Sequence, residues 1–404
     1  MSSVSNKPLA IVIGRNYTTR LALIRAVGMA GCEVVTIQTA KNQRTLNGID
    51  ASSKYVVDSK ICSEPNTEGL VNLILSYKDE RRRVILIPAD DFAAATIDSH
   101  MDLLKDGFLM PHVNNIQGAI VKLMDKKYQK SLANKVGLKT SDGWLAINNN
   151  GVYCIPEGVK YPCFTKPLES YSDGHLKHYL LKCDTESELQ TVLNSIAKEN
   201  HKLPILIEKY NRIDKEYAIL GLSLGNKAII PSVIQMGTSQ NGLTATGTIF
   251  PISKIPQLRE QLVEFMKETQ LTGLFDIDMY ESDGQLYFNE LNVRFGASGF
   301  ALNHIINLPQ ILVHYLLSKE EKGLCVDLPV FKEHTLASEK VLRNMYLDGT
   351  ISFFKYRNFI RKADILSIES NEDVMPQRVF SKKEKHLPFI KAKLLLKNRL
   401  KVIK

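Results

Sequence analysis

One segment, GLFDIDMYESDGQLYFNELN (273–292), limits most strongly the folds open to this chain. In its first half Asp276 and Asp278 alternate with apolar residues, so a strand here has one apolar face and one carboxylate face. In its second half Glu290 and Asn292 stand on either side of a leucine. An Asp-Gly pair separates the halves, which predicts two antiparallel strands joined by a turn.

The register of this hairpin decides whether its acids meet. With a three-residue loop centred on Gly284, Asp278 and Glu290 lie directly opposite each other, and Asn292 shares their face. A two-residue turn would place Asp278 and Glu290 on opposite faces, because side chains alternate with a period of two. In the first register two carboxylates and an amide oxygen converge, a ligand set that suits Mg²⁺. The alternative is a hairpin whose acids form a solvated outer face.

Arg294 stands two residues beyond Asn292, so in an extended chain its guanidinium shares the same face. A fixed fork of donors is suited to neutralising the charge of a phosphoryl group during its transfer. We therefore count Arg294 as a candidate catalytic residue.

The pattern of the remaining chain predicts a protein of α/β and α+β class. A length of 404 residues fits two or three lobes. Residues 1–115 are predicted to form a small parallel α/β layer, with strands at 9–13, 32–37 and 84–88 and a helix over about 18–30. Its first turn has one glycine where a dinucleotide-binding fingerprint needs three.

Further elements are predicted downstream from periodicity and capping signals. They are an amphipathic helix ending at Gly137, a strand ending at 163–167, a helix from Thr185 to about 199, strands at 204–210, 216–224 and 227–236, and helices at 255–270 and 309–318. Residues 330–380 give no assignment.

The net charge of +9 is concentrated in the last residues of the chain. Residues 381–404 carry nine Lys or Arg against Glu384, which leaves 43 basic and 42 acidic residues before them. A nearly neutral body argues against a nucleic-acid partner. The tail has an apolar helical stripe beginning at Phe389, flanked by lysines, which predicts a peripheral contact with an anionic membrane surface. A terminal helix docked on the body is the alternative.

The chain opens with an apolar run of only six residues, too short for a secretory signal or a membrane span. Six cysteines show no zinc-ligand spacing and are expected to be reduced. We expect a cytoplasmic protein, with the tail as its contact with the inner face of the membrane.

Taken together, the motifs MDKK, CFTKP, ILIEKY, KEYAI, GLFDIDMY and FNELNVRFGASG, in this order and spacing, resemble the ATP-grasp superfamily. The similarity covers roughly residues 1–320 and is greatest to the carbamoyl-phosphate-synthase-like carboxylate–amine ligases. It implies an ATP-grasp fold with an N-terminal parallel α/β (pre-ATP-grasp) domain, a small lid domain and a central antiparallel sheet. The implied domains are 1–115, a lid region over 116–205, a core with the metal site over 206–325, and a C-terminal extension over 326–404.

The resemblance also implies roles for ten residues, with ATP and Mg²⁺ or Mn²⁺ as cofactors. For the nucleotide these are Lys126 and Lys166 at the phosphates, Glu208, Lys209 and Tyr210 at the hinge beside adenine, and Glu216 at the ribose hydroxyls. For the metal they are Asp278, Glu290 and Asn292, with Arg294 beside an acyl-phosphate and Lys166 also acting in catalysis.

The implied reaction joins a carboxylate, such as an amino acid, to an amine through an acyl-phosphate. The chain looks most like the D-aspartate ligase type, which implies a peptidoglycan or cell-surface polysaccharide precursor as acceptor. Segments 237–248 and 294–300 are candidates for substrate binding. The loop at 169–175 has one glycine where the family usually has several. Two alternatives remain: a non-catalytic ATP-binding module, and a ligase acting on small-metabolite amines.

Overall fold

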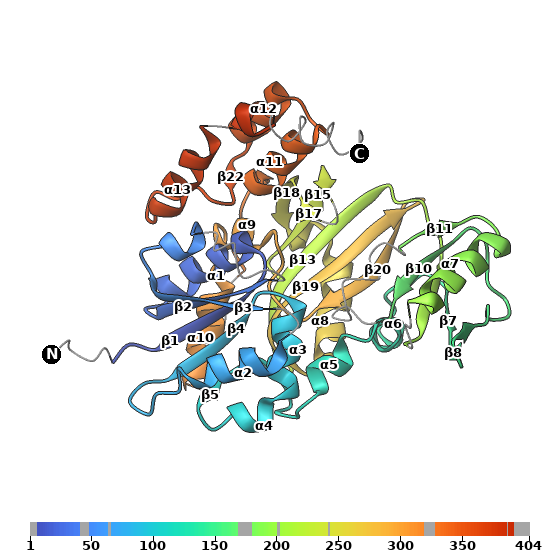
Figure 1. Cartoon of the computed structure of the whole chain (residues 1–404), viewed down its shortest axis with the longest axis horizontal. Helices are drawn as coiled ribbons and strands as arrows, with labels where there is room; N and C mark the ends of the chain where they lie inside the picture. Colours follow the sequence, from blue (N-terminus) through green and yellow to red (C-terminus); the bar gives the residue numbers. More distant parts are fainter. Residues whose placement is uncertain are drawn as a thin grey trace.

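The computed structural model describes residues 6–40, 48–63, 66–168, 180–199, 203–240, 243–318, 328–385 and 387–391. Figure 1 shows an N-terminal sheet, a long central sheet and a small sheet at the far end, with a group of C-terminal helices above. Among the described residues, every helix is too short or too polar to span a bilayer.

The N-terminal lobe is built on a five-stranded parallel sheet with strand order β3-β2-β1-β4-β5. Every residue of β1 is buried, as expected for a parallel strand with helices on both faces. This confirms the predicted parallel layer. Its elements are β1 (Leu9–Gly14), α1 (Tyr17–Met29), β2 (Glu33–Ala40), β3 (Val56–Ser63), α2 (Thr67–Leu75), β4 (Val84–Pro88), α3 (Asp91–Ser99), α4 (Met101–Leu104) and β5 (Phe108–Leu109).

A buried ion pair ties α1 to the chain that precedes β3. Arg20 and Asp50 are each 1% exposed, and Arg20 Nε donates to Asp50 Oδ2 at 2.8 Å. Arg20 also donates to the carbonyl of Gly14, the last residue of β1. The pair therefore links the helix, the sheet and the following segment in one contact.

We expect Arg20→Met to lower the free energy of unfolding by about 3 kcal/mol, because it leaves Asp50 buried without its counter-charge. Denaturant unfolding followed by circular dichroism measures the change. Arg81→Met is the matched control: its side chain is 67% exposed and paired with Asp79. Such surface pairs contribute roughly 0–1 kcal/mol. Equal losses in both variants would contradict the structural role of the buried pair.

The central sheet forms the middle of the molecule, in the order β20-β19-β13-β15-β18-β21-β22. All pairs in it are antiparallel except β21 with β22. Its strands are β13 (Lys215–Leu224), β15 (Ser232–Met236), β18 (Thr246–Pro251), β19 (Leu271–Ser282), β20 (Gln285–Asn292), β21 (His334–Ala337) and β22 (Ile365–Leu366), with β6 (His112–Val113) and β14 (Ala228–Ile229) at its side.

Helices cover both faces of this sheet. On one face Phe265 of α8 and Ala133 of α6 belong to a core with Phe275 and Phe288. On the other face, residues of α9 and α10 join the apolar side of α1 in a second core, which fixes the N-terminal lobe against the sheet. These helices are α5 (Ala119–Leu123), α6 (Lys126–Lys135), α8 (Pro256–Thr269), α9 (Gly299–Asn303) and α10 (Leu308–Ser318).

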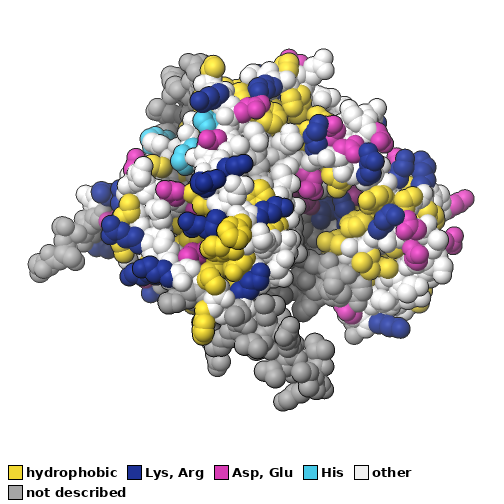
Figure 2. All heavy atoms as spheres, turned by 90° about the horizontal axis from the view of Figure 1, so that it is seen from above, with side chains coloured by type: hydrophobic (Ala, Val, Ile, Leu, Met, Phe, Trp, Pro, Cys, Tyr) yellow, Lys and Arg dark blue, Asp and Glu magenta, His cyan; other side chains and the backbone are white. Residues whose placement is uncertain are grey.

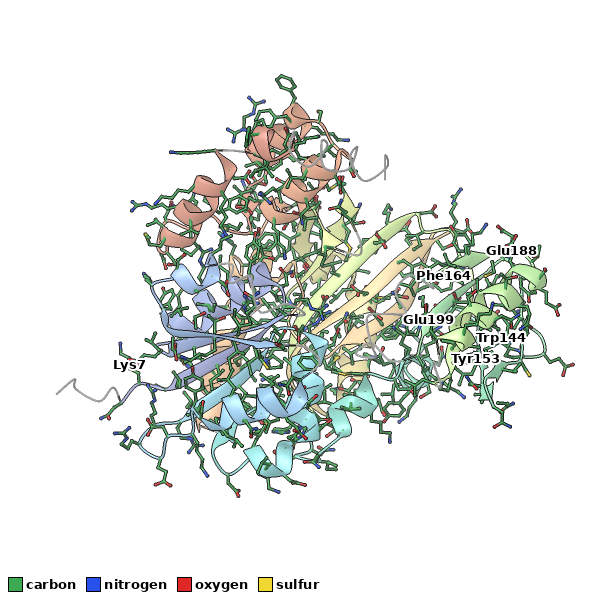
Figure 3. All side chains as sticks on the ribbon, viewed as in Figure 1. Lys7, Trp144, Tyr153, Phe164, Glu188 and Glu199 are labelled. Carbon is green, nitrogen blue, oxygen red and sulfur yellow. The ribbon has the colours of Figure 1, made fainter. Side chains whose placement is uncertain are left out.

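The small sheet at the far end is antiparallel, in the order β11-β10-β12-β7, and we call it the lid sheet. Figure 3 shows its labelled residues, among them Trp144 and Phe164, at the opposite end of the molecule from Lys7. Thr185 caps its helix as predicted, accepting from the Glu188 N–H at 3.3 Å. The elements are β7 (Gly143–Ala146), β8 (Asn148–Asn149), β9 (Val152–Tyr153), β10 (Cys163–Pro167), β11 (Lys182–Cys183), α7 (Glu186–Lys198) and β12 (Ile205–Lys209).

The predicted domain limits remain a prediction, and two elements bear on where to draw them. Helix α6, which the sequence division puts in the lid region, packs on the central sheet through Ala133. Strand β12 belongs to the lid sheet, although most of it follows residue 205. The chain therefore passes from the central sheet to the lid after α6 and returns after β12.

The C-terminal lobe (328–385 and 387–391) contains the region that the sequence pattern does not assign. Strands β21 and β22 extend the central sheet, and α11 (Glu339–Asp348), α12 (Phe353–Lys362) and α13 (Met375–Glu384) lie above it (Figure 1). Leu387 is 1% exposed and Lys391 Nζ donates to the Tyr346 carbonyl at 2.7 Å, so the start of the basic tail contacts the lobe. Most of the predicted tail helix, residues 392–404, lies outside the described residues.

Candidate active site

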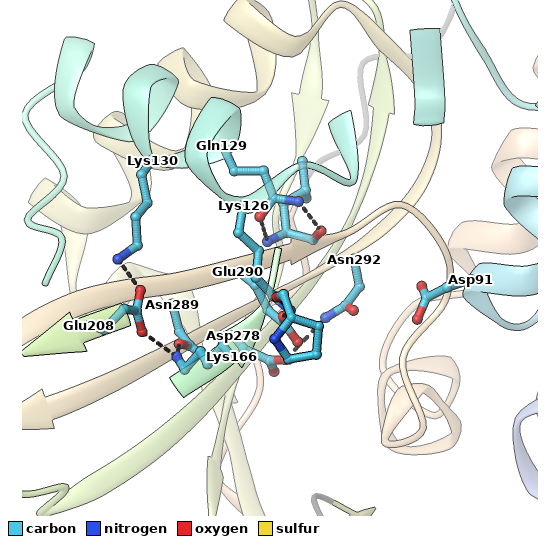
Figure 4. Close-up of polar contacts among 12 residues, drawn as sticks. Asp91, Lys126, Gln129, Lys130, Lys166, Glu208, Asp278, Asn289, Glu290 and Asn292 are labelled. Carbon is cyan, nitrogen blue, oxygen red and sulfur yellow. Dashed lines mark hydrogen bonds and ion pairs between the residues drawn. The ribbon is translucent and has the colours of Figure 1, made fainter. Parts of the chain in front are cut away.

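A cleft of about 410 Å³ opens between the lid sheet and the central sheet. Both sheets line it, the lid through β10 and β12 and the central sheet through β13, β19 and β20. Seven of the predicted site residues contribute to its lining: Lys166, Glu208, Lys209, Tyr210, Glu216, Asp278 and Glu290. Figure 4 shows the polar residues around it.

The β19–β20 hairpin brings Asp278 and Glu290 opposite each other. Its turn, however, is not the three-residue loop that would give this pairing in a regular hairpin. Ser282 pairs with Gln285, so the turn has two residues, Asp283 and Gly284, both with positive φ. The turn is therefore the two-residue alternative and not the three-residue loop.

A β-bulge restores the register that the two-residue turn would have lost. Met279 still pairs with Phe288, whereas Asp278 pairs with Glu290, which leaves Asn289 as the extra residue. A bulge re-aims the side chains around it. Here Asn289 and Glu290, although consecutive, both line the cleft, and Phe288 stays in the core at 1% exposed.

Each of these two consecutive side chains contacts one of the predicted phosphate-binding lysines. Lys166 Nζ, on β10 of the lid sheet, donates to Asn289 Oδ1 at 2.8 Å. Lys126 Nζ, at the start of α6, lies 3.3 Å from Glu290 Oε2. The bulge thereby allows two consecutive residues of β20 to contact the two lysines, which Figure 4 shows beside Asn289 and Glu290.

A buried carboxylate on β12, the strand of the predicted hinge, holds Lys166 from the other side. Glu208 is 5% exposed; its Oε2 lies 2.5 Å from Lys166 Nζ and its Oε1 is ion-paired with Lys130. Burial by itself would raise the pKa of Glu208, but Lys166 and Lys130 outweigh it and hold that pKa below its ordinary value. Burial lowers the pKa of Lys130. The side chain of Glu208 thus bridges two lysines, a role that sequence reasoning missed.

Gln129 adds a pair of hydrogen bonds that hold helix α6 over the hairpin. Gln129 is fully buried; its Nε2 donates to the Leu291 carbonyl at 2.8 Å, and its Oε1 accepts from the Leu291 N–H at 2.8 Å. Lys126 and Lys130 lie one helical turn apart on α6, so both reach the same side. The spacing of four residues between Lys126 and Lys130 was a sequence signal that could have identified Lys130. The two consecutive polar residues Asn289 and Glu290 break the alternation of polar and apolar residues, and this break could have indicated the bulge.

The polar side of β20 continues after Glu290 with Asn292, and Arg294 extends it toward the N-terminal lobe. Asn292 Nδ2 donates to Asp278 Oδ2 at 3.1 Å, and Arg294 Nη2 donates to Asn292 Oδ1 at 3.1 Å. Arg294 Nε also donates to Asp91 Oδ1 at 3.2 Å, and Asp91 is the first residue of α3. The N-terminal lobe therefore contacts the predicted catalytic arginine directly.

The acids on this face are close enough for the charge of each to change the pKa of its neighbours. Burial, followed by the charges of Asp276 and Glu290, raises the pKa of Asp278 well above its ordinary value. Burial also raises the pKa of Asp276 to about 6, although Arg294 opposes the shift. Burial acts against the charged form of Glu290 too, but Lys126 and Lys166 keep its pKa below the ordinary value. On this face, burial thus favours the protonated forms of Asp276 and Asp278, whereas Lys126 and Lys166 favour the charged form of Glu290.

The predicted metal-binding residues suit a hard divalent cation whose remaining coordination positions are filled by phosphate oxygens. In the described part of the chain, no three His, Cys, Asp or Glu side chains are grouped as a ready metal site. Asp278, Glu290 and Asn292 supply two carboxylates and an amide oxygen, and Asp276 Oδ1 is buried without a hydrogen-bond partner among the described residues. Oxygen donors with room for phosphate oxygens suit Mg²⁺.

At the hinge, the predicted backbone contacts with adenine remain a prediction. The N–H groups of Lys209 and Tyr210 donate to the carbonyls of Asp142 and Pro162, at 3.0 and 2.9 Å, so both are engaged in the lid sheet. Glu216 is exposed at the wall of the cleft on β13. In the candidate substrate segment 294–300, the Gly299 N–H already donates to the Gly296 carbonyl at 3.1 Å. The lid loop at 169–175 lies outside the described residues.

Comparison with known proteins identifies the domain that this geometry defines. The model of the ATP-grasp domain family matches residues 131–309. The large chain of carbamoyl phosphate synthase from Clostridium botulinum (strain Loch Maree / Type A3) is 24% identical over 334 residues. That match covers 79% of this chain and 29% of the relative, so the chain spans less than a third of the length of that protein.

Solved structures show the same fold at low identity. An L-amino acid ligase from Bacillus licheniformis superposes with a TM-score of 0.59 at 16% identity, over 82% of this chain and 80% of that one. The biotin carboxylase domain of 2-oxoglutarate carboxylase from Hydrogenobacter thermophilus, solved with MgADP and bicarbonate, gives a TM-score of 0.62 at 17% identity, over 81% and 73%.

The chain contains an ATP-grasp domain over residues 131–309 and has the ATP-grasp fold, and it is distantly similar to the carbamoyl phosphate synthase large chain and to ATP-grasp ligases and carboxylases. This confirms the predicted fold class. The roles of individual site residues and the resemblance to the D-aspartate ligase type remain predictions.

Proposed function

We propose that this protein is an ATP-dependent carboxylate–amine ligase that forms an amide through an acyl-phosphate and releases ADP and phosphate. The observation that carries the proposal is the gathering of two cations and two carboxylates around the β19–β20 hairpin: Lys126 pairs with Glu290, Lys166 contacts the adjacent Asn289, and Asp278 lies opposite Glu290. Catalysis of phosphoryl transfer consists mostly of positioning and charge stabilisation, which such a set can supply.

In this proposal the nucleotide lies between the lid sheet and the central sheet, with its phosphates toward Lys126 and Lys166. Asp278, Glu290 and Asn292 would hold Mg²⁺, which supplies charge neutralisation between the phosphate oxygens and the acidic face. The lysines spread the charge of the γ-phosphate while a substrate carboxylate attacks it. Arg294, held by Asp91 and Asn292, faces the acyl-phosphate that results.

The amine then attacks the acyl carbon and phosphate leaves. No protein nucleophile is needed, since the acyl-phosphate is itself the activated group. The Bacillus licheniformis protein of the same fold is named an L-amino acid ligase, which supports an amino acid as the carboxylate or the amine. Among acceptors we favour the side-chain amine of a cell-surface precursor, as the sequence resemblance implies; a small-metabolite amine is the alternative.

The direct test mixes the protein, ATP and Mg²⁺ with pooled amino acids and candidate amines. ADP release is followed continuously and new amides are identified by mass spectrometry. Release of ADP that requires both a carboxylate and an amine, with a product of matching mass, is the expected result. Nucleotide binding without turnover under any pairing would favour a non-catalytic ATP-binding module.

A further inference from the structure

Helix α12 in the C-terminal lobe carries an outer face that combines exposed aromatic and basic side chains. Phe354 is 84% exposed and Phe353 is 40% exposed. Arg357 and Arg361 lie three and seven residues beyond Phe354 and thus on the same side of the helix. We call Phe353, Phe354, Lys355, Arg357, Arg361 and Lys362 the α12 outer face. The sequence of the helix, FFKYRNFIRK, contains no acid.

The opposite side of α12 anchors the helix firmly on the lobe. Tyr356 is 3% exposed and stacks near Tyr346 of α11, with ring centroids 6.0 Å apart. Both tyrosines belong to a core that includes Leu342 and Met345. Ser352 caps the helix by accepting from the Lys355 N–H at 3.2 Å. The exposure of Phe354 is therefore a property of an ordered helix and not of a loose end.

The cations of this face are left without acidic partners. Within the residues that the structure describes, no carboxylate forms an ion pair with Lys355, Arg357, Arg361 or Lys362. The same lobe does pair a cation elsewhere: Arg343 Nε of α11 lies 2.7 Å from Glu384 Oε1 of α13. Figure 2, the view from above, shows hydrophobic and basic side chains side by side on the upper surface of the molecule.

The positive charge of the α12 outer face indicates which partner could cover it: the tail of this chain, a second copy of the protein or an anionic surface. The tail of this chain carries nine basic residues against one acid, and a second copy docked through the same face would present the same cations, so both would meet the face with like charge. The tail also adds to the face: Lys391 lies over the Tyr346 ring at 4.2 Å, and Phe389 nearby in sequence is 72% exposed. An anionic surface that accepts aromatic rings is the complementary partner.

We propose that the α12 outer face docks on the surface of an anionic lipid bilayer, with Phe354 entering the headgroup region and the four cations contacting the lipid phosphates. Basic helices with aromatic residues bind bilayer interfaces in this way, and each cation near an anionic leaflet strengthens the attraction. This inference is independent of the proposed reaction. The proposal assigns a membrane contact to α12 in addition to the contact predicted for the basic tail.

The test uses the full chain and sedimentation with vesicles of phosphatidylcholine alone or mixed with phosphatidylglycerol, at low and high salt. We expect binding to the anionic vesicles only, weakened by salt. Arg357→Glu/Arg361→Glu should weaken binding by at least about tenfold, since reversing two cations removes electrostatic attraction at the surface. Phe354→Ser should weaken it as well, because the ring no longer enters the interface.

Matched controls lie on other surfaces. Arg259→Glu/Lys198→Glu reverses two exposed cations on α8 and α7, and Ile116→Ser changes a side chain that is 58% exposed. Truncation after Lys391 separates the α12 outer face from the tail and should leave part of the binding. Circular dichroism checks that each variant is folded. Absence of binding to anionic vesicles by the wild type, or equal loss in the α12 and control variants, would overturn the proposal; a soluble acidic protein would then be the better partner.

Discussion

Replacing Glu290 by alanine is expected to abolish measurable ATP turnover, with a loss of about 4 kcal/mol of transition-state stabilisation, roughly a thousandfold in rate. Glu290 pairs with Asp278 across the hairpin and lies 3.3 Å from Lys126 Nζ. Its removal takes away one of the two carboxylates proposed to hold Mg²⁺ and leaves Lys126 without its acidic partner. Continuous measurement of ADP formation, at saturating ATP and Mg²⁺, gives the rate.

Glu281→Ala is the matched control for this variant. Glu281 is an acid on the same hairpin, but its Oε1 lies 3.1 Å from Lys215 Nζ and it does not line the cleft. We expect it to retain nearly all activity. Wild-type rates in the Glu290→Ala protein would show that this hairpin is not the metal site.

The second large effect is expected for Lys166→Ala, which should lower kcat/KM for ATP by a factor on the order of 10²–10³, the usual consequence of losing one preorganised donor at a site of developing charge. Lys166 contacts both Asn289 and Glu208, so its ammonium group is held in place before the nucleotide arrives. Without it, Glu208 is neutralised by Lys130 alone, and its pKa should rise toward the ordinary value. Steady-state kinetics and calorimetric titration with ATP separate the loss of binding from the loss in kcat.

Two further variants make the Lys166 result specific. Lys160→Ala removes a lysine of the same lid whose side chain is 61% exposed and paired with Asp142, and it should behave as wild type. Lys166→Arg keeps the cation and should recover part of the activity. If Lys166→Ala binds and hydrolyses ATP normally, the phosphates do not lie at this end of the cleft.

Much of the fold follows from local pattern. The run of Leu9–Gly14 is apolar throughout, and such strands are stable only when helices cover both faces, so the parallel layer could be predicted. Thr185 with Glu188 three residues later is a local capping signal, and it marked the start of α7. In the region after residue 330, β21 and β22 gave no such signal, because they are short strands whose pairing partners lie far away in the sequence, whereas Ser352 was a local cap signal for α12.

The sequence by itself determined which residue types would be available for chemistry: alternating acids on one strand face, and lysines at fixed spacing from them. The tertiary structure decided how they meet. The two-residue turn at Asp283 and Gly284 alone would have separated Asp278 from Glu290, and the bulge at Asn289 brings them together again. The break in alternation at Asn289 is a local hint of a bulge, but the register that results depends on packing across the sheet, here Phe288 in the core and Gln129 on Leu291. The bridge from Glu208 to Lys130 and Lys166 joins an α-helix, the hinge strand and the lid, so only long-range packing could create it.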